Sequence, residues 1–394
     1  MGQGAKVDWD QAREMGLNPQ ALQQLLAVIE QDTTKGVYDG AVIALGRSGR
    51  MILHEAIGFA DRAKNRQVRR DDIFFIMSIT KTFTAAMVLS RIERGELALT
   101  TPVAEVIPEF GVKGKQRVTV YHLLTHQGGI SSDLPLLLPL DQVGNLQAYV
   151  AAAANEPLRA KPGQLVWYSI FTGHALLAEM VRRLDGGQRP FRRMLAEDLF
   201  EPLKMKDTAL GLRPDLVSRL APLVYRDSVI GLFEPMLVES MNVLFTEETE
   251  LPAGGAISTA GDIYRWAEML RRGGELEGAR VLSPGMIEMA TQVHTGSKPN
   301  HLFDYACEMH GWDQFPANLG FSFFLRGEDQ HPAPMGSLAS PFTFAGLGAG
   351  STMFWVDPDR DLSFVFLSTG LLEEGRNFLR LQKLSDLVLT SVLE

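Results

Sequence analysis

The sequence of 394 residues predicts an α+β fold, with one antiparallel sheet formed from both chain ends, flanked by helices, and a mostly helical domain inserted between them. Two observations carry this prediction. Strand-like segments lie near the two ends and are joined by short hairpin-type connections, which favour antiparallel pairing. The middle of the chain has helical periodicity, interrupted by loops that contain Pro and Gly. We therefore expect an α/β domain of residues 1–90 and 256–394 and a mostly helical domain of residues 91–255.

The first elements are a helix and a hairpin. A helix is expected at about 19–31, and a hairpin at 42–61 follows, where two runs rich in Val, Ile and Leu are separated by GRSGR. The middle of the chain predicts helices at 81–94, 145–154, 170–184, 190–199 and 262–272.

The C-terminal part supplies the remaining strands. Strands are predicted at 319–325, 351–358 and 361–370, and the tight turn Asp-Pro-Asp-Arg joins the last two. An amphipathic helix at 379–393 closes the chain.

Composition excludes several classes of protein. The net charge of −9 provides no positive field, so neither nucleic acid nor an anionic membrane is expected as a partner. The single cysteine, Cys307, cannot form an internal disulfide, which suits a reducing compartment. The N-terminal segment lacks the pattern of a secretory signal, and Lys6 stands where a myristoylation signal requires Ser or Thr. No apolar run reaches the roughly 18 residues of a membrane span. These observations predict a soluble, cytoplasmic protein.

A serine and a lysine interrupt the apolar run FFIMSITKTFTAAMVL at residues 74–89. Residues three apart share one helix face, so Ser78 and Lys81 are expected side by side near a helix N-terminus, where developing negative charge is favoured. A serine hydroxyl needs a base to become a nucleophile, and a desolvated lysine can reach its neutral form. The alternative interpretation is a helix cap with a lysine that reaches solvent.

Five segments of the chain, taken in order, carry more information than the Ser-x-x-Lys tetrad alone. They are RRDDIFFIMSITKTFTAAMVLSRIERGELALTTPVAEVIPEF, VTVYHLLTHQGGI, KPGQLVWYSIFTGHALLAEMV, LPAGGAISTAGDIYRWAEMLRRGG and FWVDPDRDLSFVFLST. Together they resemble the serine β-lactamase and penicillin-binding-protein superfamily, and within it the class C-like family VIII carboxylesterases. The resemblance runs from about residue 19 to the C-terminus and implies a β-lactamase-like fold with the active site at the domain interface.

The resemblance implies roles for individual residues. Ser78 matches the nucleophile, Lys81 its activating lysine, and Tyr168 the tyrosine of the family's Tyr-x-Asn motif. Ile170 stands in place of that Asn. This departure weakens β-lactam recognition more than ester cleavage, because an apolar side chain cannot replace an amide contact.

The third family motif, Lys-Thr-Gly in β-lactamases, also departs from the pattern. An ungapped alignment places it at Gly346-Leu347-Gly348, whereas the alternative register Phe344-Ala345-Gly346 needs two inserted residues. In the ungapped register, the N–H of Ala349 joins the N–H of Ser78 as an oxyanion hole.

Substrate contacts are expected from this motif and from two apolar segments. Segments 131–141 and 225–245 are rich in Leu, Met and Phe and are predicted as loops that wall an apolar pocket, although either can instead be core. The substrate-binding residues expected are Gly346, Leu347, Gly348, Ile170, Trp167 and Phe344.

Two further motifs are set aside. His122 and His126 have the spacing of a helical metal pair, but the glutamate of His-Glu-x-x-His is absent, so no metal is expected and both should hydrogen-bond locally. The segment GLGAGS precedes a strand rather than a helix, which does not suit a dinucleotide. No cofactor is expected.

The resulting hypothesis is a serine carboxylesterase that cleaves small to medium apolar esters through an acyl-enzyme on Ser78. Either Lys81 or Tyr168 could be the general base. The alternatives are a β-lactamase or D,D-peptidase, an acyltransferase of the same superfamily, and a non-catalytic binding protein. A small-molecule ester is the expected partner, and the sequence does not predict the oligomeric state.

Overall fold

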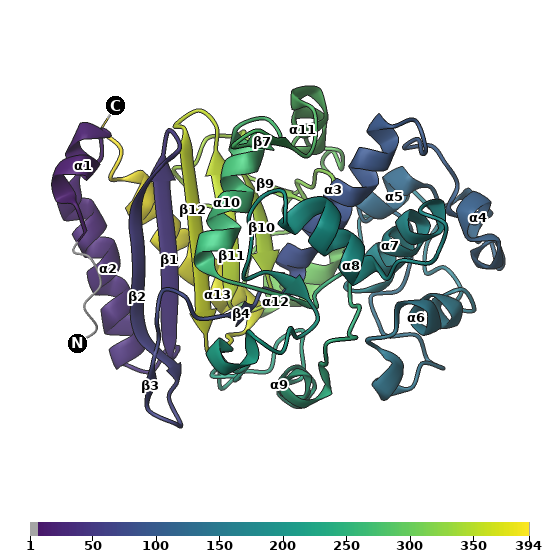
Figure 1. The fold of residues 1–394 in the computed structure, drawn as a ribbon, viewed down its shortest axis with the longest axis horizontal. Coiled ribbons are helices and arrows are strands. Elements are labelled where there is room, and N and C mark those ends of the chain that lie inside the picture. The colour runs from purple at the N-terminus through teal and green to yellow at the C-terminus, as the bar shows by residue number, and fades with distance from the viewer. Residues whose placement is uncertain (1–6, 394) are drawn as a thin grey trace.

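Strands from the N-terminal and C-terminal parts of the chain form one sheet. The computed structural model describes residues 7–393 and contains a seven-stranded antiparallel sheet in the order β3-β2-β1-β12-β11-β10-β9 (Figure 1). Its central pair joins β1 (Gly40–Arg47) to β12 (Leu362–Thr369), with Gly40 opposite Thr369. The α+β fold, with a sheet assembled from both ends, is therefore confirmed, whereas the domain boundaries stay a prediction. The predictions about a secretory signal and myristoylation depend on Lys6 and the segment before it. These residues lie outside the described part of the chain.

Helices and strands have the following bounds. The α-helices are α1 (Trp9–Glu14), α2 (Pro19–Thr34), α3 (Thr80–Glu93), α4 (Val103–Val106), α5 (Val120–Leu124), α6 (Leu146–Ala153), α7 (Thr172–Leu184), α8 (Phe191–Leu195), α9 (Pro235–Leu244), α10 (Ala260–Arg271), α11 (Pro284–Ala290), α12 (Asp304–His310) and α13 (Glu374–Leu389). The other strands are β2 (Arg50–Asp61), β3 (Arg66–Gln67), β4 (Phe74–Phe75), β5 (Ala209–Leu210), β6 (Ala256–Ser258), β7 (Glu275–Leu276), β8 (Ala279–Arg280), β9 (Phe324–Leu325), β10 (Phe344–Gly348) and β11 (Thr352–Asp357). Within residues 7–393, no helix combines the length and the apolar character needed to cross a membrane.

Both faces of the sheet are covered. In β1, Val42 and Ala44 belong to the apolar core that includes Trp266 of α10, while Ala41 and Ile43 belong to the core formed with α2 and α13. Figure 1 shows α10 in front of the sheet and α13 behind it. Because both faces are buried, β12 is a nearly continuous apolar run rather than an alternating one.

Helix α3 is the central helix of the molecule. It is buried along most of its length and packs against α7. The Phe83 ring meets the rings of Phe200 and Trp266 edge to face, with centroids 5.1 and 4.9 Å away. This packing fixes the helix whose N-terminal end carries Ser78 and Lys81.

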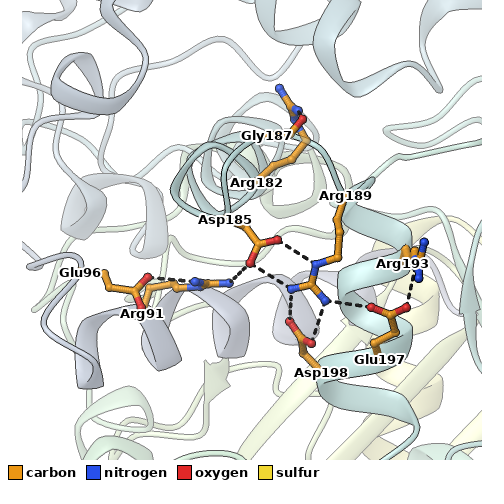
Figure 2. A network of polar contacts seen from close by, with 9 residues as sticks. All are labelled: Arg91, Glu96, Arg182, Asp185, Gly187, Arg189, Arg193, Glu197 and Asp198. Carbon is orange, nitrogen blue, oxygen red and sulfur yellow. Dashed lines mark hydrogen bonds and ion pairs between the residues drawn. The ribbon is translucent and has the colours of Figure 1, made fainter.

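An ion-pair network holds the other end of α3 (Figure 2). Arg91 donates to Asp185, the residue that follows α7, with 3.1 Å between Nη2 and Oδ1. Asp185 also accepts from Arg189 Nε at 2.8 Å, and Arg189 reaches Glu197 and Asp198 at 2.9 and 3.0 Å. The network therefore links α3 to α7 and to the turn after α8.

Asp185→Asn is expected to lower the free energy of unfolding by about 1–3 kcal/mol, because it leaves the nearly buried Arg91 with one carboxylate partner instead of two. Hydrogen bonds from Arg189, and then from Arg91, lower the pKa of Asp185, so its contribution is present at neutral pH and is lost as the pH falls through that pKa. Urea denaturation measures the change. The control is Asp10→Asn, which breaks an exposed pair with Arg13 and should leave the midpoint unchanged. Equal midpoints for the two variants would contradict the prediction.

Three predicted elements differ in extent. The strand expected at 319–325 is confined to β9, because residues 320–323 form a turn in which Ser322 has a φ of 67°. The helix expected at 190–199 is α8 followed by one π-helical turn. The last helix begins at Glu374, five residues earlier than expected, because the Glu373 side chain caps it by accepting from two backbone N–H groups. The segment 225–245, predicted as a loop, contains α9.

Candidate active site

Ser78 lies in a 3-10 turn, Met77–Ile79, that leads directly into α3. The residue before it, Met77, has a φ of 51°, which is uncommon for a side chain of this size and indicates local strain. The Thr80 hydroxyl donates back to the Met77 carbonyl at 2.6 Å and helps to hold the turn. Nothing in the sequence indicated the strained residue.

Lys81 is buried beneath Ser78, with 1% of its surface exposed. Its Nζ lies 3.0 Å from Ser78 Oγ, 2.7 Å from the Ile170 carbonyl and 2.8 Å from the Ala253 carbonyl. None of the ion pairs found within residues 7–393 includes Lys81. Burial therefore lowers its pKa well below 10.5. The alternative interpretation, a lysine that reaches solvent, is wrong.

Tyr168 comes from a distant segment and faces the same pair. Its ring lies beneath Lys81 Nζ, 4.9 Å from centroid to nitrogen. Burial raises the pKa of the Tyr168 phenol above its usual value of 10, and the nearby Ser78 hydroxyl acts in the opposite direction. The phenol is therefore protonated at neutral pH, whereas burial of Lys81 favours the neutral amine.

A buried histidine supports the tyrosine ring. His126 stacks on Tyr168 with centroids 4.1 Å apart, and its Nδ1 accepts from the Ser169 N–H at 3.0 Å. Burial lowers its pKa, and a proton on Lys81 would lower it further, so the ring is neutral. The predicted hydrogen bond to a residue nearby in the sequence is confirmed for His122, which bonds Thr119. The prediction is wrong for His126, because its partner Ser169 lies 43 positions away. The HLLTH spacing singled out His126, but only the fold reveals its contact with Tyr168.

Strand β10 brings Ala349 close to Ser78. The space beside Gly348 is so narrow that a Cβ there would lie 2.5 Å from the Ile76 carbonyl and 3.2 Å from the Met77 Cβ. Ala349 follows directly and lines two cavities together with Ser78. Leu347 and Gly348 also line the smaller cavity, as the ungapped register leads one to expect.

Three expected substrate contacts are not supported. Trp167, Phe344 and Gly346 line neither cavity. Trp167 neighbours Tyr168 but packs under the Arg159 guanidinium, 5.8 Å from its ring. Phe344 is buried against Phe323. A Cβ on Gly346, which lies on the same side of β10, would meet the Phe354 ring at 2.4 Å.

Ile170 and the two apolar segments do surround Ser78. Ile170 lines both cavities, and its carbonyl accepts from Lys81. Segment 131–141 contributes Leu134 and Leu140 to the larger cavity, and segment 225–245 contributes Phe233 and five of the ten residues of α9. The site therefore combines a buried amine, a serine, a phenol and apolar walls.

A match to a family model and the similarity to known relatives place the chain in the β-lactamase-fold superfamily of serine hydrolases, which includes esterases. A family model described as Beta-lactamase matches residues 25–386, so the chain belongs to the Beta-lactamase family.

Individual relatives include both esterases and penicillin-binding proteins. The Esterase/beta-lactamase LipL of Mycobacterium tuberculosis is 26% identical over 85% of this chain and 78% of its own length. The structure of a penicillin-binding protein homologue from Caulobacter crescentus is 25% identical, with a TM-score of 0.76 over 94% of this chain and 98% of that one. A family VIII carboxylesterase structure has a TM-score of 0.73 over 93% and 98% of the two chains. Its identity is 20%, so this likeness shows the fold alone.

Proposed function

We propose that this protein is a serine carboxylesterase that forms an acyl-enzyme on Ser78. The observation that carries the proposal is the environment of Lys81. A neutral amine has two N–H donors and one lone pair, and the Ile170 and Ala253 carbonyls are placed to accept both N–H groups. The lone pair then faces the Ser78 hydroxyl at 3.0 Å, where it can take the proton.

The neutral amine of Lys81 and the protonated phenol of Tyr168 take different roles in the reaction. Lys81 acts as the base when Ser78 attacks the ester carbonyl, and the protonated Tyr168 gives its proton to the departing alcohol oxygen. The N–H groups of Ser78 and Ala349 stabilise the negative oxygen of the tetrahedral intermediate. In this proposal, residues 1–90 and 256–394 supply Ser78, Lys81 and Ala349, while residues 91–255 supply Tyr168.

An ester is favoured over a β-lactam by the apolar side chain at position 170, next to Ser78. Ile170, which lines both cavities, cannot provide the amide contact of lactam-cleaving relatives. The name of LipL covers both activities, so the two substrate classes need a direct comparison.

We expect kcat/KM for a short-chain methyl ester to exceed that for a chromogenic cephalosporin by about 10²-fold or more, since Ile170 cannot provide the amide contact that would bind the lactam. Acid release from the ester and the absorbance change of the cephalosporin, both with the purified full chain, measure the two rates. A cephalosporin rate equal to the ester rate would favour the β-lactamase instead.

A further inference from the structure

Two cavities meet at Ser78. The larger has a volume of about 410 Å³ and the smaller about 50 Å³. They share Ser78, Ile170, Phe233 and Ala349. Ser78 and Ala349 are the two residues of the proposed oxyanion hole, so an ester carbonyl held there would extend one arm into each cavity.

The larger cavity is mostly apolar. Its walls come from residues 134–147, from α9 and from the residues after it, and they include Leu134, Leu146, Val238, Met241 and Phe245. The charged side chains in this lining are Asp141, Glu248 and Glu250, which would repel an anionic occupant. Leu140 and Leu244 are 61% and 49% exposed, so the cavity opens onto an apolar rim along which a longer chain can continue.

The smaller cavity contains the proton donor. Tyr168 lines this cavity and is absent from the lining of the larger one. Large apolar side chains enclose it, among them Leu232, Phe303, Phe324 and Phe378. Because the departing alcohol must receive a proton at its oxygen, that oxygen has to lie on the Tyr168 side of the carbonyl carbon.

We propose that the smaller cavity holds the alcohol and the larger one the acyl chain, so that the substrates are esters of a medium to long apolar acid with a small alcohol. This inference rests on the proposed esterase function. The larger cavity has about eight times the volume of the smaller one, so only the larger cavity can take the long arm of such an ester.

The reaction balances with water as the only co-substrate. Ser78 Oγ bonds the acyl carbon as its proton passes to Lys81, and the bond from that carbon to the alcohol oxygen breaks as Tyr168 supplies a proton. The small alcohol leaves its cavity, and the proton on Lys81 restores the phenol. Water then enters the vacated space beside Tyr168, and its oxygen bonds the acyl carbon as Lys81 takes one of its protons. The bond from the acyl carbon to Ser78 Oγ breaks, and the proton on Lys81 passes to Oγ, which releases the acid and restores the Ser78 hydroxyl.

Two isomeric esters test the assignment. Methyl octanoate and heptyl acetate have the same composition, but the long arm is the acid in one and the alcohol in the other. With the wild-type chain, we expect kcat/KM for methyl octanoate to be at least about tenfold higher, measured by acid release. Equal rates, or faster cleavage of heptyl acetate, would overturn the assignment.

Variants in each cavity provide a second test. A Cβ on Gly254, in the larger cavity, meets only Met77 backbone atoms, at 3.8 Å or more, so Gly254→Leu should fill that cavity. It should lower the ratio of methyl octanoate to methyl acetate turnover by about tenfold. Leu232→Ala should widen the smaller cavity and raise the heptyl acetate rate. The matched control is Gly285→Leu, on exposed α11 where a Cβ meets nothing within 4 Å, and it should keep all ratios.

The outcomes separate this inference from the function on which it rests. Ester turnover that is the same in Ser78→Ala would overturn the proposed function, and with it the cavity assignment. Two results would overturn the cavity assignment alone, provided that turnover depends on Ser78. One is a preference for heptyl acetate. The other is a ratio of methyl octanoate to methyl acetate turnover that Gly254→Leu leaves unchanged.

Discussion

Ser78→Ala should lower kcat/KM for ester hydrolysis by about 10⁴-fold or more. Without Oγ, no acyl-enzyme can form, and water would have to attack the carbonyl with no activated nucleophile. The backbone N–H groups of residues 78 and 349 stay in place, so a small residual rate is expected from the proposed oxyanion hole. Initial rates of acid release from methyl octanoate, at equal concentrations of folded protein, measure the effect.

The chain offers a matched control on the same helix. Ser90 lies on α3, and its hydroxyl donates to the Met87 carbonyl at 2.9 Å, its one side-chain hydrogen bond within residues 7–393. Ser90→Ala should therefore retain wild-type turnover. Loss of activity in Ser90→Ala, or full activity in Ser78→Ala, would show that the chemistry does not depend on the predicted serine.

Lys81→Met should lower kcat/KM by about 10³-fold, because the base is lost while the volume of the side chain is nearly kept. In the wild type, kcat/KM should rise with pH through the lowered pKa of Lys81, since the neutral amine is the active form. Lys206→Met, at an exposed position, is the control and should retain turnover. An active Lys81→Met variant would show that Tyr168 alone can serve as the general base.

The same substitution should change the dependence of stability on pH. Between the lowered pKa of folded Lys81 and the unfolded value of 10.5, the unfolded chain binds one more proton, so wild-type stability rises with pH in this window. The methionine side chain of the variant does not titrate. The stability of the variant relative to the wild type should therefore be greater at pH 7 than at pH 10, as measured by calorimetry. The opposite trend would mean that the folded protein keeps Lys81 charged.

Local sequence patterns were sufficient to predict several elements of the fold and one contact of the site. The β1–β2 hairpin, β11, β12 and α3 follow from apolar runs and turn residues, and the contact of Ser78 with Lys81 follows from their spacing of three. Such features depend on residues close together in the chain.

The remaining features depend on contacts between distant segments. Tyr168 was identified only through the family resemblance, and its stacking on His126 joins residues 42 positions apart. Trp167 was predicted to border the same cavity as the apolar segments, but its ring packs under the Arg159 guanidinium instead. Helix α9 was missed because its apolar residues serve the cavity and the exposed rim as well as the core, which blurs the helical period.

The central claim is that Ser78 is made nucleophilic by the buried amine and phenol around it. Incubation with a fluorophosphonate probe, followed by mass measurement and peptide mapping, tests this most directly. The predicted result is one adduct per chain, on Ser78, and none on Ser78→Ala. An adduct on another residue, or no adduct from a protein that hydrolyses esters, would contradict the claim.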